Sequence, residues 1–88
     1  MASDADARRV YWHSRRGMLE LDLILVPFVE QQYSDLSEAD QQAYRSLLEC
    51  EDTDIYAWMM QRSEPKEESL RPIVQRIVHH AKSDRDSP

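Results

Sequence analysis

The stretch RRGMLELDLILVPFV, residues 15–29, places the only glycine of this 88-residue chain directly before its most apolar segment. Glycine adopts positive φ at little cost and is common just past a helix C-terminus, where arginines also suit the helix dipole. We therefore predict that a first helix ends near Arg15 and that Gly17 lets the chain turn. A second interpretation stays open: a residue without a side chain lets the backbone of a partner come close.

The apolar residues that follow Gly17 lie on nearly all sides of a helix from Met18 to about Tyr33. A helix of this kind is expected at the centre of a bundle. Pro27 lacks a backbone donor and crowds the preceding turn, so we expect one bent helix. The segment is too short, and carries too many charges, to span a membrane.

Capping residues followed by apolar residues three and four apart predict three more helices. These are a helix over about 38–50 capped by Ser37, a short helix capped within Asp52-Thr53-Asp54, and a helix over about 70–81 capped by Ser69 with Pro72 in its first turn. The expected fold is all-α, a small single-domain bundle of five helices over residues 1–82. The polar residues 83–88 lack an apolar anchor and are expected to form a disordered C-terminal tail.

Charge and cysteine content narrow the classes of partner and compartment. The chain has 11 basic and 17 acidic side chains and a net charge of −6, which disfavours nucleic acid and anionic membranes as partners. Cys50 is the only cysteine, so an intramolecular disulfide is impossible and a reducing compartment is indicated. The first residues lack the features of a secretory signal or transit peptide. We expect a cytoplasmic protein.

The sequence contains no convincing constellation for catalysis or metal binding. Glu20 and Asp22 are two residues apart and point about 200° apart on a helix, so they do not form a carboxylate pair. His79 and His80 also diverge and have no third ligand three or four residues away. Cys50 has no histidine base nearby in sequence, and a single glycine rules out a glycine-rich phosphate loop. We expect no enzyme activity, no catalytic residue and no bound metal.

The stretch around Gly17 has the chemistry of a protein-binding surface. Arg16 carries a planar guanidinium that suits a carboxylate, Met18 is an adaptable apolar side chain, and Glu20 is an acceptor about one turn further on. Trp12 and Trp58 are either aromatic anchors for a partner or core residues.

Two blocks of the sequence resemble a known family. The first is RGMLE, residues 16–20, with Arg9 and Trp12 at the spacing that the family shows before the glycine. The second is LLECEDTDIYAW, residues 47–58. On these blocks the chain resembles, from about residue 9 to 80, the bacterial flavinylation factors of succinate dehydrogenase, the SdhE type.

The resemblance implies a five-helix bundle, expected to be monomeric, that binds the flavoprotein subunit of succinate dehydrogenase and also that of fumarate reductase. Such a factor promotes covalent attachment of FAD to a histidine of the flavoprotein, while the bond-forming chemistry belongs to the flavoprotein. Its contribution would be to stabilise one arrangement of the partner's domains. The FAD would sit on the partner, with none held stably by this chain, and no nucleic acid or direct membrane insertion is implied.

The resemblance also implies which residues make contact. The partner-binding set is Arg9, Arg16, Gly17, Met18, Glu20 and Asp22. A possible second surface consists of Glu49, Asp52, Asp54 and Trp58; the alternative is that Asp52 or Asp54 caps a helix while Trp58 packs inward. Arg16→Ala and Glu20→Ala are expected to weaken flavinylation with little change in melting temperature.

Two other functions compete with this one. Family members have also been described as antitoxins, so the alternative is an antitoxin-like helical regulatory protein that acts through protein–protein contacts. A nucleic-acid-binding module depends on the N-terminal arginines alone, and the acidic net charge argues against it. Identification of the protein that co-purifies with the chain would separate these functions.

Overall fold

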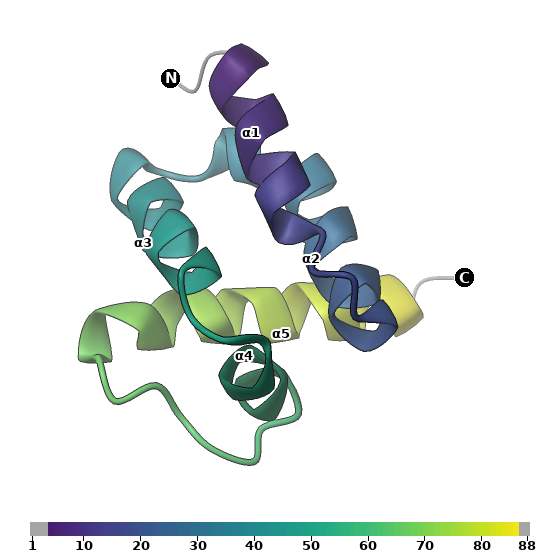
Figure 1. Ribbon diagram of the computed structural model, residues 1–88, viewed down its shortest axis with the longest axis vertical. Coiled ribbons are helices and arrows are strands. Elements are labelled where there is room, and N and C mark those ends of the chain that lie inside the picture. Colours follow the sequence, from purple (N-terminus) through teal and green to yellow (C-terminus); the bar gives the residue numbers. More distant parts are fainter. Residues whose placement is uncertain (1–3, 87–88) are drawn as a thin grey trace.

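Helices account for most of residues 4–86, the part of the chain that this computed structural model describes (Figure 1). The helices are α1 (Asp4–Ser14), α2 (Leu19–Gln32), α3 (Glu38–Leu48), α4 (Asp52–Met59) and α5 (Arg71–Asp86), with short 3-10 turns η1 (Tyr33–Asp35) and η2 (Glu68–Leu70). No strand occurs within these residues. The predicted all-α bundle of five helices is confirmed.

Helix α2 contributes to the centre of the bundle and contacts α1, α4 and α5. Leu21, Leu25 and Phe28 are fully buried along one side of it. Pro27 lies inside the helix, which runs through it without a break, so the expectation of a single helix is confirmed. On the opposite side of α2, Leu19 and Leu23 are exposed although they are as apolar as the buried residues.

Two helix starts show where local capping patterns hold and where they fail. The Ser37 hydroxyl accepts a hydrogen bond from the Asp40 backbone N–H at 3.1 Å, so α3 begins with the predicted cap. Helix α4 instead has Glu51 at its N-cap, with no side-chain cap bond, and Asp52 is already its first helical residue. The predicted cap within Asp52-Thr53-Asp54 was therefore wrong, because all three residues lie inside α4 and the Asp52 carboxylate is bonded to a distant arginine.

Helix α5 crosses the bundle and turns Ile73, Val74, Ile77 and Val78 towards the core. Pro72 falls in its first turn as predicted, whereas Ser69, the predicted cap, lies within η2. The helix continues to Asp86, so residues 83–86 of the expected disordered tail are helical, and residues 87–88 lie outside the described part. Adding a residue to a helix that packing already stabilises costs little free energy.

A buried pair of hydroxyl groups ties α1 to α3. The Ser14 hydroxyl donates to the Val10 carbonyl at 2.8 Å and lies 2.7 Å from the Tyr44 hydroxyl. Burial raises the pKa of the Tyr44 phenol well above its ordinary value, and the hydrogen bond to Ser14 opposes this shift only partly.

Within residues 4–86 no helix combines the length and apolar character needed to cross a bilayer.

Candidate functional site

The loop between α1 and α2 carries the predicted turn. Gly17 has a φ of +81°, in the left-handed region that favours glycine, so its predicted role at the end of the first helix is confirmed. Gly17 is exposed, and a Cβ atom built on it would meet no other atom within 4 Å. The backbone conformation therefore accounts for the glycine, and the open space leaves the loop accessible to another molecule.

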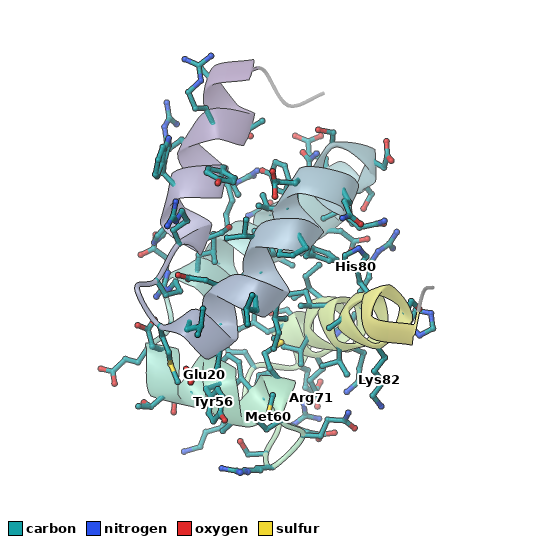
Figure 2. All side chains as sticks on the ribbon, turned by 90° about the vertical axis from the view of Figure 1, so that its right-hand side faces the viewer. Glu20, Tyr56, Met60, Arg71, His80 and Lys82 are labelled. Carbon is teal, nitrogen blue, oxygen red and sulfur yellow. The ribbon has the colours of Figure 1, made fainter. Side chains whose placement is uncertain are left out.

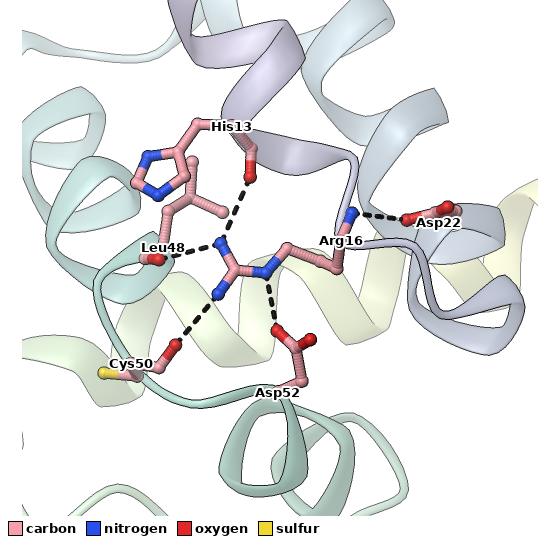
Figure 3. A network of polar contacts seen from close by, with 6 residues as sticks. All are labelled: His13, Arg16, Asp22, Leu48, Cys50 and Asp52. Atoms are coloured by element: carbon pink, nitrogen blue, oxygen red, sulfur yellow. Dashed lines mark hydrogen bonds and ion pairs between the residues drawn. The ribbon is translucent and has the colours of Figure 1, made fainter.

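The Arg16 side chain, in contrast, points into the protein (Figure 3). Its Nη1 atom donates to the His13 carbonyl at 3.1 Å and to the Leu48 carbonyl at 2.8 Å, and Nη2 donates to the Cys50 carbonyl at 3.0 Å. Its Nε atom lies 2.7 Å from Asp52 Oδ1. Only 12% of the side chain is exposed. The guanidinium thus joins the end of α1 to the connection between α3 and α4.

This arrangement satisfies carbonyl groups that have no partner inside a helix. His13 is in the last turn of α1, Leu48 ends α3, and Cys50 lies in the connection that follows. Carbonyls at helix C-termini carry partial negative charge, so a buried cation is favourable there. Arg16 is therefore a structural side chain that fixes the Gly17 loop. We expect its removal to lower stability, whereas the sequence predicted little change in the melting temperature of Arg16→Ala.

Asp22 and Met18 also help to shape this loop. The Asp22 carboxylate accepts a hydrogen bond from the Arg16 backbone N–H at 2.8 Å (Figure 3). Met18 is half-buried against the core, and its carbonyl accepts bonds from the backbone N–H groups of Leu21 and Asp22 at the start of α2. Both residues belong to the predicted contact set, and both hold the loop in its conformation.

Glu20 lies on an exposed apolar part of α2. Leu19 and Leu23, one turn apart on this helix, are 68% and 66% exposed. Glu20 and Leu23 line a groove of about 400 Å³ together with residues after α4 and on α5, including Met60 and His80. Figure 2 shows Glu20 and Met60 on the same side of the molecule. The groove includes Leu23, and no part of residues 4–86 covers the side chains of Leu19 and Leu23.

The expectation that the whole apolar helix lies at the centre of the bundle was wrong for Leu19 and Leu23, which are exposed. Their positions are offset from the stripe formed by Leu21, Leu25 and Phe28, so they face away from the other helices. When nearly every residue of a helix is apolar, the pattern does not show which side is covered. Glu30 lies on the same side of the helix as Leu19 and Leu23, and this acidic position was the available signal that the side faces solvent.

Helix α1 adds an aromatic side chain close to this loop. Trp12 is 59% exposed, with the Arg15 guanidinium 5.7 Å from its ring centre and Tyr11 edge-on at 5.4 Å. Arg9, one turn before Trp12, is also exposed. Trp12 is therefore a surface residue and fits the role of an anchor better than that of a core residue.

The second predicted surface is divided between two roles. Asp52 is bonded to Arg16, whereas Glu49 and Asp54 are exposed and Trp58 is half-buried against the core. Among the described residues, no group of three or more histidine, cysteine or acidic side chains is placed to hold a metal ion. In the pair His79 and His80, the Nε2 atom of His80 lies 3.0 Å from Gln31 Oε1.

Comparison with known proteins agrees with the family resemblance of the two sequence blocks. The family model described as "Flavinator of succinate dehydrogenase" matches residues 8–81. The chain is 51% identical to "FAD assembly factor SdhE" of Pseudomonas aeruginosa, over 96% of this chain and 100% of that protein. It is 42% identical to the protein of the same name from Aliivibrio fischeri, over 91% and 93% of the two chains. The chain therefore belongs to the family of succinate dehydrogenase flavinators.

Proposed function

We propose that this chain binds the flavoprotein subunit of succinate dehydrogenase and promotes covalent attachment of FAD to it. The similarity over nearly the whole chain to proteins named FAD assembly factors carries the proposal. The chain itself supplies no catalytic residue and holds no FAD stably, so its contribution is positional. By the same reasoning it also serves the flavoprotein of fumarate reductase.

The docking surface of this proposal centres on the exposed Gly17 loop and the neighbouring part of α2. Gly17 allows close approach, Glu20 offers a carboxylate to a donor of the partner, and Leu19 and Leu23 supply apolar area that is otherwise exposed. Apolar anchors beside a few polar groups are typical of the centre of an interface. Trp12 and Arg9 on α1 extend the surface.

Arg16 and Asp22 contribute to this surface mainly by fixing the conformation of the loop that forms it. They hold the loop at a fixed position relative to α2 and to the connection between α3 and α4. A preorganised loop loses little conformational entropy on binding, so more of the contact energy is available to favour one partner conformation. Binding accelerates flavinylation only if that conformation, with flavin and acceptor histidine aligned, is bound more tightly than the others.

Replacement of Glu20 tests the contact role directly. Glu20 is exposed, so Glu20→Ala should leave the melting temperature nearly unchanged while weakening binding about tenfold, as expected for a central interface residue. Glu30→Ala, at an exposed position near the other end of α2, is the matched control. The measurement is covalent flavin on the purified apo-flavoprotein incubated with FAD and each variant, read as in-gel fluorescence.

The experiment separates a failure of the contact role of Glu20 from a failure of the proposed function. Equal flavinylation with Glu20→Ala and the control would remove Glu20 from the contact surface. A wild-type chain that neither binds the apo-flavoprotein nor increases its covalent flavin would refute the proposed function as a whole.

A further inference from the structure

A second groove begins beside the Arg16 network, at Cys50, whose carbonyl accepts a hydrogen bond from Arg16. It has a volume of about 770 Å³ and runs between the end of α3, helix α4 and the segment that leads into η2. Apolar and aromatic side chains form part of its wall, among them the half-buried Trp58 and the buried Pro65 and Leu70. The block at residues 47–58 thus contributes a concave surface that the proposed docking of Glu20 does not use.

Negative charge surrounds this apolar wall. Four carboxylates line the groove, Glu49, Asp54, Glu64 and Glu67, and Lys66 is the single basic side chain among the lining residues. Glu64 lies 4.0 Å from Arg71. The other three carboxylates form no ion pair with any described residue. Their charge is therefore available to a cation from outside.

The Cys50 thiol reports on the field inside the groove. Burial raises the pKa of this thiol, and the negative charges of Asp54, Glu67 and Glu49 raise it further, against an opposing effect of Arg16. Carboxylates from α4, from the segment before η2 and from the end of α3 therefore act on the same point. Several carboxylates that face one point beside apolar side chains attract a positive group more strongly than the same charges would in bulk water.

We propose that this groove docks a positively charged segment of the partner flavoprotein, in which an arginine or lysine stands beside an apolar side chain. The apolar side chain lies against Trp58 and Leu70, and the cation lies between Glu49 and Glu67. This inference rests on the proposed function, because it takes the flavoprotein as the occupant. Charge complementarity selects a basic segment, and a guanidinium suits this site because its planar fork of donors matches carboxylates.

The Arg16 network gives this second contact a mechanical link to the first. Arg16 holds the carbonyl of Cys50 and the carboxylate of Asp52, which belong to the connection beside the groove, and its own backbone is part of the Gly17 loop. The two surfaces therefore keep a fixed spacing. Two contacts at fixed spacing favour the one partner arrangement that presents both matching surfaces.

The proposal is tested by replacing carboxylates that line the groove with neutral amides of nearly the same shape. The double variant Glu49→Gln/Glu67→Gln removes two negative charges at exposed positions, neither of which makes a side-chain cap bond. Glu30→Gln/Glu38→Gln removes the same charge from exposed positions away from the groove. Binding of each full-length variant to the purified apo-flavoprotein is measured by calorimetry at about 0.05 M and 1 M salt.

The groove variant should bind about fivefold more weakly than wild type at low salt, and the difference should nearly vanish at 1 M salt, where charges are screened beyond about 3 Å. The control pair should show less than half of this effect. A second readout is the fluorine resonance of Trp58 in 5-fluorotryptophan-labelled protein, assigned with Trp58→Phe. This resonance should shift when the flavoprotein binds.

Two results would overturn the inference while leaving the proposed function intact. They are tight wild-type binding with no difference between the groove variant and its control, and a Trp58 resonance that does not move on binding. Failure of the wild-type chain to bind the flavoprotein would instead refute the proposed function.

Discussion

Truncation of Arg16 is the most direct test of the division between structural and contact residues. Arg16→Ala removes three hydrogen bonds to backbone carbonyls and one to the Asp52 carboxylate. All four bonds are made by the charged guanidinium, and a hydrogen bond of this kind contributes about 1.5–3 kcal/mol. Water can enter after truncation, and Asp52 is 40% exposed, so we discount the sum to a loss of about 3 kcal/mol in the free energy of unfolding.

For a domain of this size, that loss corresponds to a fall in melting temperature of about 12–24 °C. Urea unfolding followed by circular dichroism measures it, and the slope with urea should stay the same because the fold is retained. Arg16→Lys should lose about 2 kcal/mol, since an ammonium group cannot match the planar set of four acceptors. Arg8→Ala, at an exposed position on α1, is the control and should change stability by less than about 0.5 kcal/mol.

The same variants separate a positioning role from a contact role. If Arg16 acts by holding the Gly17 loop, flavinylation by Arg16→Ala should recover in part when the temperature is lowered, because the native loop is then more populated. A loss of stability below about 0.5 kcal/mol would refute the reasoning. Unchanged stability with abolished binding would show that Arg16 contacts the partner directly.

Two other predictions concern a backbone conformation and a buried phenol. Gly17→Ala and Gly17→Arg should each lower stability by about 1 kcal/mol, because φ at this position is +81°, but only the arginine variant should abolish flavoprotein binding in a pull-down. Equal binding by both would contradict the close-approach role. Burial raises the pKa of Tyr44 above its ordinary value of 10.0, so the neutral phenol stabilises the fold below pH 10, and this contribution is lost as pH rises through the raised folded-state pKa. Urea titrations at pH 9 and pH 11 should show that the wild-type chain is less stable at pH 11. The loss should be smaller in Tyr44→Phe, and what remains comes from Tyr33, whose pKa is also raised by burial. An equal loss in Tyr44→Phe and wild type would show that Tyr44 is not its source.

Local sequence patterns predicted the elements of the fold well because the forces behind them are local. The Ser37 cap, the turn at Gly17 and the apolar stripe of α5 depend on residues a few positions apart. The same reasoning failed at Asp52, whose carboxylate pairs with an arginine 36 residues away instead of capping α4. No pattern within α4 contains that information.

The sequence alone determined that this chain forms five helices, that Gly17 lets the chain turn after the first helix, and which two blocks carry its family membership. Only the tertiary structure decided that Arg16 points inward, that Leu19 and Leu23 remain exposed, and that residues 47–58 form one groove with residues 63–70. The physical reason is range. Helix formation depends on neighbours within one turn, whereas the direction of a side chain depends on which distant carbonyls, charges and apolar surfaces the packed helices bring to it.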